Sequence, residues 1–562
     1  MRPERFQTLV TVVSLATTAL VGCVPPADGP PETFGHDFSM PGGTRTDGAL
    51  VFVVDGVNAE TFERMLAGGE LPAIERYFVA RGLYAPRAVA NVPSVTLANL
   101  TSIATGVWPG HHGVTGINWF DRDRLIWRDY TTIAQKNTLD GDYVAPTLFE
   151  RLSGRTSFSV FFQPHRGASK FIENWTSAGP PYFFGWYEFV DRLTLYRLDI
   201  VAEVARQRRE WPGVTVCYLL APDFRGYGYG ASSPQYRQAL RHTDRQIGRV
   251  LGDLDRAGLL QTLHIVLISD HGMVDVERHF PLERFLRDEA GLDVARAHLW
   301  DKTPFRRRLD YYRDYSCVYY GSGDRYAAIC LRKPLRAADG KVTGFAAWPV
   351  RPDRDDLLRY PRRDGFKPRD GRYNAVSGDT VNLLEMLTLM REVQAVAYRV
   401  APNRVRLICT GGSEVEFRQE RGRGGPIRYR CITGDDPLGW RGVVPEALLT
   451  GQPASPRAWL TATVGGDYAD LPAQLLAYFR APRAGDLAVF AAPGWDFSDQ
   501  HAAGHGGLTA GEMHVPFLLA GPGVPHGRLD TARTVDLVPT LLQLLNGHVP
   551  AGMDGRSLVG EE

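Results

Sequence analysis

The chain has 562 residues, and its 64 lysine and arginine residues almost balance its 63 aspartate and glutamate residues, so the formal net charge is +1. A chain without a positive excess lacks the attraction on which general nucleic-acid binders depend, so we expect no specific nucleic-acid binding, and nothing in the sequence indicates a protein partner. With 44% hydrophobic and 23% charged residues the composition is that of a globular protein, which excludes disorder or a fibrous repeat as a description of the whole chain.

The N-terminal segment has the pattern of a bacterial lipoprotein signal peptide. Two arginines precede an uncharged apolar stretch, residues 6–20, which is too short to cross a membrane as a helix. The Leu-Val-Gly-Cys run at residues 20–23 resembles a lipobox, in which the cysteine is lipidated. We therefore expect residues 1–22 to be removed and Cys23 to carry a lipid that anchors the exported protein to the periplasmic or cell-surface face of a bacterial membrane. A plain signal peptide is the alternative, and the Pro- and Gly-rich residues 23–47 predict a flexible tether.

Three continuous apolar runs predict buried strands of a mostly parallel sheet. They cover residues 49–54, 214–221 and 264–268. A helical pattern over residues 235–254 predicts one of the helices that cover such a sheet. The runs end next to Asp55, Asp223 and Asp270. Because ligands bind beyond the carboxyl ends of the strands in an open α/β sheet, we expect these three acids to converge on one site.

The pattern changes after residue 282, where tyrosine-rich and alternating segments predict the strands and loops of an inserted or interleaved α+β region. Further buried strands are predicted at residues 485–492 and 515–519, and a closing amphipathic helix at residues 535–545. The predicted division is 48–282 for the first part of the core, 283–484 for the inserted region and 485–562 for the second part of the core.

The cysteines of an exported protein are candidates for disulfides. The sequence-near pairs Cys317 with Cys330 and Cys409 with Cys431 are the plausible bridges. Cys217 lies inside a buried apolar run, so we expect a free thiol that packs as a small hydrophobic group. The chain has no CxxC motif, which argues against a cysteine metal site.

Carboxylates and imidazoles at the predicted strand ends form the strongest candidate site. They are Asp55, Asp223, Asp270, His271 and His505. Oxygen and imidazole ligands of this kind bind divalent metals, and a pair of metals needs several of them from different loops. Each residue alone also fits a helix cap or a turn. Their combination favours a metal site, since both histidines precede glycines that leave room for an ion.

A hydroxyl-rich segment from Pro93 to Val114 adds a second part of the pattern. Thr96 is followed by Thr105-Gly106 nine residues on, by Pro109 at thirteen and by His112-Gly113 at sixteen. With the aspartates and histidines above, this order of motifs resembles the type I phosphodiesterase and nucleotide pyrophosphatase group of the alkaline phosphatase superfamily. The resemblance covers most of residues 49–282 and 485–559.

The resemblance implies an α/β fold with an alkaline-phosphatase-like core, in which a mostly parallel sheet lies between helix layers. It also implies a metal-dependent phosphodiesterase or nucleotide pyrophosphatase, with Thr96 matched to the nucleophile. By position, one metal is held by the residues matching Asp55, Thr96, Asp270 and His271. A threonine hydroxyl beside a divalent cation loses its proton easily and attacks phosphorus, and metal-activated water then hydrolyses the phosphothreonine. We also expect Thr96 to cap the helix that begins at Leu97.

The second metal set implied by the resemblance is incomplete. Asp223 and His505 match it, but the histidine expected four residues after Asp223 is Tyr227. A phenol with its usual pKa of about 10 is a poor metal ligand at neutral pH. Three alternatives stay open: a weak second site, recruitment of His501, or another role for Tyr227.

Asn118 is the other catalytic candidate. The family has an asparagine 21 residues after the nucleophile that helps to hold a phosphoryl oxygen, and here that position is Ile117, with Asn118 next to it. We expect a cofactor of one or two divalent ions, zinc first with manganese as the alternative. The expected substrate is a small phosphodiester or another phosphorylated compound.

Several other functions compete with this one. A phosphomonoesterase or phospholipase-like enzyme would use the same core, and a surface-anchored binding module on a degenerate scaffold would explain Tyr227 and Ile117. A sulfatase is disfavoured, since the Cys/Ser-x-Pro-x-Arg segment that is converted to formylglycine does not occur in the chain.

Overall fold

The structure is a computed structural model. It describes residues 47–131, 136–173, 175–208, 211–295, 311–367, 378–498 and 500–560. The predicted signal peptide, Cys23 and all of the predicted tether except residue 47 lie outside the described residues, so export and lipid anchoring stay predictions. No helix in the described part of the chain is both long enough and apolar enough to cross a membrane.

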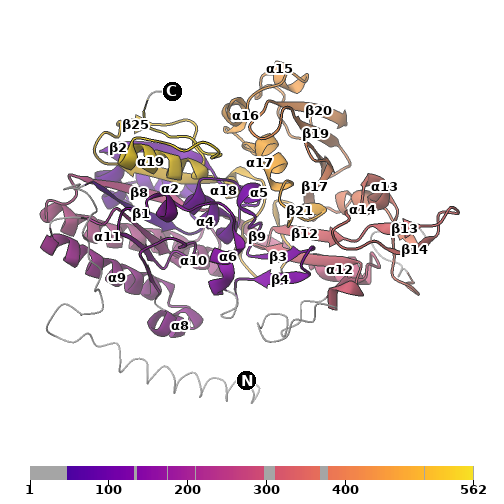
Figure 1. Cartoon of the computed structure of the whole chain (residues 1–562), viewed down its shortest axis with the longest axis horizontal. Coiled ribbons are helices and arrows are strands. Elements are labelled where there is room, and N and C mark those ends of the chain that lie inside the picture. Colours follow the sequence, from indigo (N-terminus) through magenta and orange to yellow (C-terminus); the bar gives the residue numbers. More distant parts are fainter. Residues whose placement is uncertain are drawn as a thin grey trace, which may run out of the picture.

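An eight-stranded sheet, the core sheet, has the strand order β25-β2-β24-β8-β1-β7-β5-β6 (Figure 1). Its strands are β1 (Gly48–Val54), β2 (Gly82–Val89), β5 (Ser157–Val160), β6 (Lys170–Ile172), β7 (Val214–Leu219), β8 (Leu263–Ser269), β24 (His514–Ala520) and β25 (Gly527–Arg528). The strands from β8 to β6 run parallel, while β24 is antiparallel to both of its neighbours. The sheet is therefore mostly parallel, as predicted.

Strand β1 lies in the middle of the sheet and is buried along its whole length. Leu50 and Phe52 face one hydrophobic cluster, whereas Val51 and Val53 face another on the opposite side. Burial on both faces explains why this segment is continuously apolar instead of alternating.

Helices cover both faces of the core sheet. On the side of Leu50 lie α2 (Ala59–Ala67), α9 (Tyr187–Arg208) and α11 (Pro234–Arg256). On the side of Val51 lie α4 (Thr96–Thr105), α17 (Leu471–Tyr478) and α19 (Leu537–Asn546). The predicted helix at 235–254 is α11, which begins where the Ser233 hydroxyl accepts a hydrogen bond from the backbone N–H of Tyr236. The predicted closing helix is α19.

Shorter helices connect these elements. They are α3 (Pro72–Ile74), α5 (Pro109–His112), α6 (Leu139–Asp142), α7 (Leu148–Arg151), α8 (Trp175–Phe183), α10 (Ala221–Tyr229), α12 (Leu282–Asp288), α13 (Arg354–Leu358), α14 (Leu383–Thr388), α15 (Glu446–Leu449), α16 (Pro456–Thr463) and α18 (Ala510–Met513).

A second, largely antiparallel sheet has the order β10-β11-β12-β21-β17-β18-β19-β20 and is called the second sheet below. Its strands are β10 (Val294–Ala295), β11 (Cys317–Ser322), β12 (Tyr326–Leu331), β17 (Val393–Ala401), β18 (Arg404–Cys409), β19 (Glu414–Gln419), β20 (Ile427–Thr433) and β21 (Leu487–Ala491). The boundary predicted at residue 485 assigned β21 to the core, but β21 pairs with β12 and β17. The chain therefore completes the second sheet before it returns to the core sheet at β24, and the other predicted boundaries stay predictions.

The two sheets share one hydrophobic core. Val318 and Ala328 of the second sheet belong to the same buried cluster as Val51 of the core sheet and Leu100 of α4. The opposite face of the second sheet packs against α12, α13 and α14. The two halves that lie side by side in Figure 1 are therefore joined by apolar packing, not only by the chain.

Both predicted disulfides are wrong, because all five described cysteines are free thiols. Cys317 and Cys330 lie on paired strands but point to opposite faces of the second sheet, into different hydrophobic clusters. Cys409 and Cys431 lie on β18 and β20, with β19 between them. Two strand spacings amount to roughly 9–10 Å, beyond the Cα separation of about 7 Å that a disulfide spans. Cys217 is the buried free thiol that its apolar run predicted.

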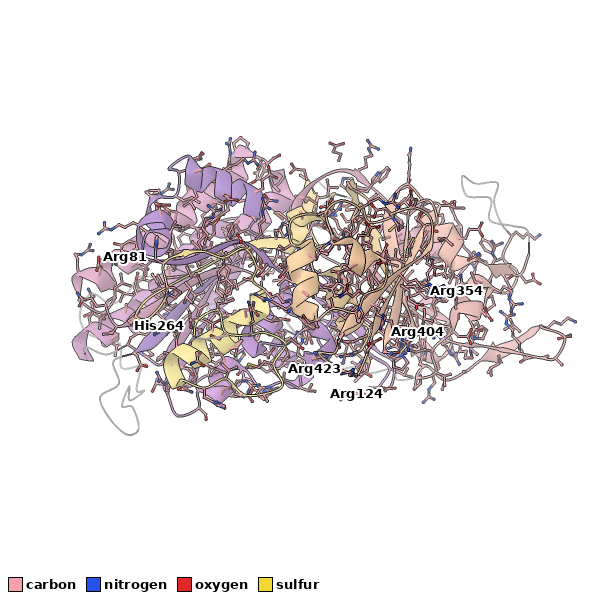
Figure 2. The ribbon with its side chains drawn as sticks, turned by 90° about the horizontal axis from the view of Figure 1, so that it is seen from above. Arg81, Arg124, His264, Arg354, Arg404 and Arg423 are labelled. Atoms are coloured by element: carbon pink, nitrogen blue, oxygen red, sulfur yellow. The ribbon has the colours of Figure 1, made fainter. Side chains whose placement is uncertain are left out.

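A loop of the second sheet also contacts the C-terminal segment. Arg423 lies in the loop after β19 (Figure 2). Its Nε donates to Oδ1 of Asp554 at 3.1 Å. The other oxygen of Asp554 accepts from the backbone N–H of Trp108 at 2.8 Å and lies 2.6 Å from Nδ1 of His111. Asp554 thereby links this loop of the second sheet to the segment that follows α4.

A buried ion pair connects the turn between β11 and β12 to α18. Arg325 and Glu512 are both 0% exposed, and Nε of Arg325 donates to Oε1 of Glu512 at 2.8 Å. The guanidinium also donates to the backbone oxygens of Ala492, at 3.1 Å, and Trp495. The carboxylate of Glu512 accepts from the backbone N–H of Gly507 at 2.7 Å. Each charge thus has several partners that replace water.

We predict that Arg325→Met lowers the free energy of unfolding by about 3–5 kcal/mol, because Glu512 is then a buried charge without its partner. Urea unfolding measures this change. Arg441→Met is the control, since Arg441 pairs with Asp435 where both side chains are more than half exposed. This control should cost less than about 1 kcal/mol. Equal losses in the two variants would contradict the role of the buried pair.

Candidate functional site

The register of the core sheet brings the three predicted acids to one edge. Val54, the last residue of β1, pairs with Leu219 of β7 and with Ser269 of β8. Asp55 and Asp270 therefore follow neighbouring strands, and Asp223 lies in the first turn of α10, just after β7. Their side chains are buried, with exposures of 2%, 0% and 4% for Asp55, Asp270 and Asp223.

A small three-stranded sheet brings the two predicted histidines together. It contains β22 (Gly494–Asp496), β9 (Val274–His279) and β23 (Ala503–Gly504). β9 begins just after His271, and β23 ends just before His505. Gly504 pairs with Val274. The two imidazole rings are stacked with their centroids 3.6 Å apart.

Backbone carbonyls determine which nitrogen of each imidazole carries the proton. Nδ1 of His271 lies 2.9 Å from the carbonyl of Gly272, and Nδ1 of His505 lies 2.8 Å from that of Ser94. Nδ1 therefore donates in both rings, and Nε2 presents a lone pair. Burial lowers the pKa of His271 to about 3 and that of His505 well below 6.5, so both rings are neutral.

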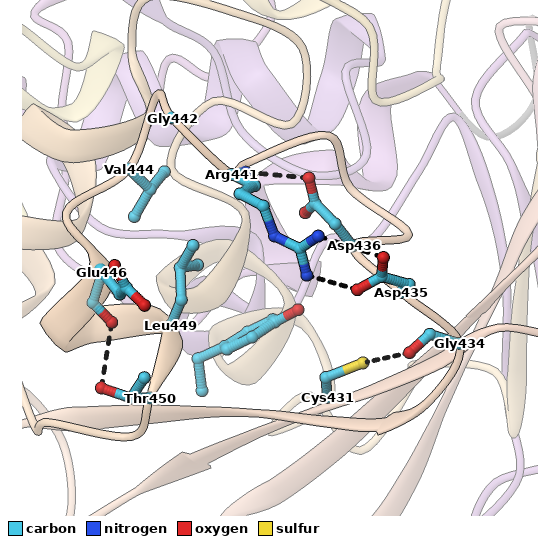
Figure 3. Close-up of a pocket in the computed structure, with 11 residues that line it drawn as sticks. Cys431, Gly434, Asp435, Asp436, Arg441, Gly442, Val444, Glu446, Leu449 and Thr450 are labelled. Carbon is cyan, nitrogen blue, oxygen red and sulfur yellow. Dashed lines mark hydrogen bonds and ion pairs between the residues drawn. The ribbon is translucent and has the colours of Figure 1, made fainter.

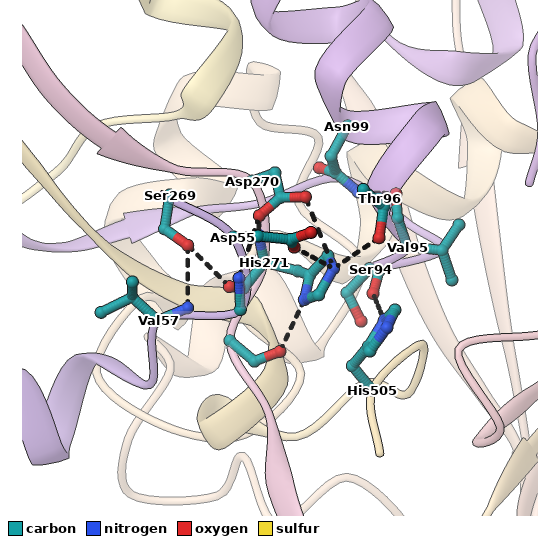
Figure 4. Close-up of polar contacts among 12 residues, drawn as sticks. Asp55, Val57, Ser94, Val95, Thr96, Asn99, Ser269, Asp270, His271 and His505 are labelled. Carbon is teal, nitrogen blue, oxygen red and sulfur yellow. Dashed lines mark hydrogen bonds and ion pairs between the residues drawn. The ribbon is translucent and has the colours of Figure 1, made fainter. Parts of the chain in front are cut away.

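Nε2 of His271 faces three oxygen atoms (Figure 4). It lies 3.3 Å from Oδ1 of Asp55, 3.5 Å from Oδ2 of Asp270 and 3.1 Å from Oγ1 of Thr96. The remaining oxygen of each carboxylate is held by the protein: Tyr218 donates to Asp55, and backbone N–H groups donate to Asp270. Each acid thus directs one oxygen into the site.

These acceptors lack donors in the described part of the chain. Oδ1 of Asp55, Oδ1 of Asp223 and Oδ2 of Asp270 are buried without a hydrogen-bond partner. Burial raises the pKa of Asp55, and the charge of Asp270 raises it further; burial and the charge of Asp55 do the same for Asp223. Unpaired buried acceptors with raised pKa values are costly, and a divalent cation would satisfy them. The residues present therefore fit a metal.

Two groups of side chains have metal-ligand spacing, and His271 belongs to both. One is Asp55, Asp270 and His271; the other is Asp223, His271 and His505. Within each group the ligand atoms lie within 4.8 Å of one another. The structure thus brings together all five predicted aspartate and histidine ligands.

Thr96 is the first residue of α4, and Val95 occupies the cap position, so the prediction that Thr96 caps this helix is wrong. The Thr96 hydroxyl turns instead toward His271, because the preceding turn is fixed by Asn99. The Asn99 amide donates to the carbonyls of Pro93 and Val95 at 3.0 and 3.1 Å. Thr96 is half-buried, while its neighbours on both sides are buried. The sequence analysis missed Asn99, although an asparagine inside an apolar helical pattern is a signal for such an anchor.

Residues 49–333, half of the 562-residue chain, match the family model of type I phosphodiesterase / nucleotide pyrophosphatase. The chain belongs to this family. Among curated relatives, it is 27% identical to human ectonucleotide pyrophosphatase/phosphodiesterase family member 1 over 258 residues, which cover 45% of this chain and 27% of the relative. It is 23% identical to venom phosphodiesterase 2 of Crotalus adamanteus over 241 residues, covering 42% and 28%. The matched region is about a quarter of the length of these relatives.

A solved structure of human ectonucleotide pyrophosphatase/phosphodiesterase 5 resembles this chain over nearly its whole length. The TM-score is 0.51, the identity 15%, and the alignment covers 91% of this chain and 97% of the other. The likeness supports the fold alone. With the mostly parallel core sheet, it confirms the prediction of an alkaline-phosphatase-like fold with an added α+β region.

Tyr227, which stands where the family pattern has a histidine, contacts His505. Its hydroxyl lies 2.7 Å from Nε2 of His505, and since that nitrogen carries a lone pair, the phenol is the donor. Burial raises the pKa of Tyr227 well above 10, and the charge of Asp324 raises it further. Tyr227 therefore remains a protonated donor. His501, the alternative ligand, lies beside it, with the ring centroids 4.8 Å apart.

Asn118 is not brought into the group around Thr96. It is the first residue of β3 (Asn118–Asp121), which pairs with β4 (Ile126–Asp129). Its side-chain oxygen accepts a hydrogen bond from the hydroxyl of Ser322 at 3.1 Å, at the end of β11. Asn118 thus contacts the second sheet, and its catalytic role stays a prediction.

A separate pocket lies between β20 and α15 and shares no residue with the two ligand groups (Figure 3). Cys431, Asp436 and Leu449 line it, and Arg441 is paired with Asp435 across it. The guanidinium of Arg441 is thus already paired, and the other charged residues that line this pocket, Asp436 and Glu446, are acidic.

We predict that zinc stabilises the protein, because a cation relieves the unpaired acceptors of Asp55, Asp223 and Asp270. At about 100 times its dissociation constant the gain is about 2.7 kcal/mol, visible as a higher unfolding temperature that a chelator reverses. Asp270→Asn should lose most of the gain, whereas Asp435→Asn, at an exposed position, should keep it. The same zinc response in both variants would contradict the site.

Proposed function

We propose that this chain is a metal-dependent phosphodiesterase or nucleotide pyrophosphatase that uses Thr96 as its nucleophile. The observation that carries the proposal is the position of the half-buried Thr96 hydroxyl, 3.1 Å from Nε2 of His271. It lies among the inward-facing oxygens of Asp55 and Asp270, so one residue serves both as an accessible hydroxyl and as a neighbour of the metal ligands. The names of the relatives, a nucleotide pyrophosphatase and a venom phosphodiesterase, agree with this chemistry.

In this proposal one divalent ion is held by Asp55, Thr96, Asp270 and His271. A second ion is held by Asp223 and His505 together with at least one further ligand. Zinc suits the mixture of carboxylate and imidazole ligands, with manganese as the alternative. When bound, such ions favour the deprotonated hydroxyl and offset the negative charge of the phosphoryl group.

The protein's own residues position the reacting groups. Oγ1 of Thr96 forms a bond to phosphorus while the bond to the leaving oxygen breaks, and that oxygen takes the electron pair. Thr96 opens α4, a helix of ten residues, whose N-terminal N–H groups and dipole favour a phosphate at this end. Water then displaces Thr96 from phosphorus, and the threonine regains its proton.

The location and substrate are further parts of the proposal. We propose that the protein is exported and lipid-anchored at Cys23, which agrees with the extracellular sense of the names "ectonucleotide" and "venom" in its relatives. The substrate is a phosphodiester or pyrophosphate, and the second sheet, which borders the site through its β11–β12 turn, is proposed to determine which one. Tyr227 is the observation that favours the alternative, a binding module on the same scaffold.

We predict that Thr96→Ala lowers the hydrolysis of bis(p-nitrophenyl) phosphate by about a thousandfold or more, because the nucleophile is removed. Thr101→Ala is the matched control in the same helix, since the Thr101 hydroxyl donates only to the backbone of Leu97 at 2.7 Å. It should keep activity within about twofold. Acid quenching of the wild type during turnover should trap phosphate on Thr96, detected by mass spectrometry. Activity that survives in Thr96→Ala would rule out this nucleophile, and a wild type that binds substrate without turnover would favour the binding module.

A further inference from the structure

The second ligand group, Asp223, His271 and His505, has too few ligands of its own for a metal ion. Asp223 is 4% exposed and its Oδ1 has no partner, while Nε2 of His505 is occupied by the Tyr227 hydroxyl. Two protein ligands besides the shared His271 are few for a divalent ion, and Tyr227, a protonated phenol, is a poor third. If an ion binds here, another side chain must contribute.

Asp324 lies next to this group in space. It is the central residue of the turn between β11 and β12, and it forms an isolated β-bridge with His505. The backbone N–H of His505 donates to the carbonyl of Gly323 at 2.8 Å, and the N–H of Arg325 donates to the carbonyl of His505 at 3.1 Å. The residues on both sides of Asp324 are therefore hydrogen-bonded to the backbone of His505.

The packing of the turn leaves little freedom at this position. A Cβ atom at Gly323 would come within 2.5 Å of Nδ1 of His505, so the turn approaches the imidazole as closely as a glycine permits. Asp324 itself has a φ of 66°, a left-handed conformation that costs a non-glycine residue energy but that aspartate and asparagine tolerate best. A strained residue held against a candidate ligand is typical of functional sites.

The charge of Asp324 acts on the whole group. It raises the pKa of Asp223, after burial and Asp55, and that of Tyr227, after burial, and it partly opposes the lowering of the His505 pKa that burial causes. A further negative charge near the buried carboxylate of Asp223 is unfavourable unless a cation balances it. Asp324 belongs to neither group of ligand atoms that lie within 4.8 Å of one another, so its carboxylate has to move toward Asp223 to share an ion with it.

His501 holds the Asp324 carboxylate from the other side. Nδ1 of His501 contacts Oδ2 of Asp324, and the side chains are 44% and 24% exposed. The His501 ring also packs edge-on against Tyr227. A ligating carboxylate is commonly hydrogen-bonded by a neighbouring group that fixes its direction, and His501 is placed for that task.

We propose that Asp324 supplies the ligand that the family pattern expects at residue 227, so that the second ion is held by Asp223, Asp324 and His505, with His501 as a positioning residue. The inference rests on the proposed function for the presence of metal, but it concerns only residues of this chain. Binding requires the Tyr227 hydroxyl to release Nε2 of His505. Exchanging an imidazole for a carboxylate makes the site richer in oxygen, which shifts its preference from zinc toward manganese.

The test measures metal stoichiometry and affinity with manganese and zinc as probes, by elemental analysis after gel filtration and by titration. The wild type should bind two ions per chain. Asp324→Asn, which keeps the left-handed backbone, should bind the first ion unchanged and the second at least about tenfold more weakly. His501→Gln should weaken only the second ion by about tenfold. Asp140→Asn is the matched control, since Asp140 pairs with His165 at similar exposure, and it should bind both ions as the wild type does.

A rescue variant separates ligation from folding. Tyr227→His in the Asp324→Asn background should restore the second ion and increase its preference for zinc, because the imidazole expected by the family pattern is then present. A second ion bound by Asp324→Asn with wild-type affinity, or a wild type that holds one ion only, would overturn the inference. A wild type that binds two ions, loses one in Asp324→Asn and yet hydrolyses no phosphodiester would refute the proposed function and leave the inference standing.

Discussion

The buried ion pair between Arg325 and Glu512 fixes three segments that meet at the site. The backbone carbonyl of Glu512 accepts from the N–H of Gly272, the residue after His271, at 2.8 Å. Its carboxylate holds Gly507 in the loop of His505, and Arg325 itself follows Asp324 in the turn of the second sheet. A single pair of charges therefore sets both imidazoles and the Asp324 turn relative to one another. Because the pair is buried, loss of either partner would leave the other as an uncompensated charge.

The same edge of the core sheet collects negative charge that the fold does not neutralise. Asp55, Asp223 and Asp270 are buried beside neutral imidazoles, and each keeps an oxygen without a donor. These unpaired acceptors lower the free energy of unfolding, but they prepare the site for a cation. The hydrophobic packing shared by the two sheets offsets this loss of stability. The Tyr227 hydroxyl partly relieves the site by donating to His505.

Sequence reasoning was strongest where a local pattern has one physical cause. The apolar run of β1 ends in Asp55 because a central parallel strand is buried on both faces, and the spacing after Thr96 follows one helix and its loop. Predictions from the sequence were wrong where contacts between distant parts of the chain determine the structure. The β-sheet register places Cys317 and Cys330 on opposite faces, and β21 pairs within the second sheet instead of the core. The contacts of Asp324 with His505 and of Glu512 with Arg325 have no local signal, because the partners lie more than a hundred positions apart.

The hydrophobic core shared by the two sheets limits which parts of the proposed enzyme can change. Because Val318 and Ala328 pack in the same cluster as Val51 and Leu100, the strands of the second sheet cannot shift without disturbing helix α4, which carries the proposed nucleophile. Change is tolerated best in exposed turns that leave this packing intact, whereas the turn that carries Asp324 has little freedom, because a Cβ atom at Gly323 would meet the ring of His505. In the proposed enzyme, new substrate preferences would then arise by altering residues at the tips of such exposed turns.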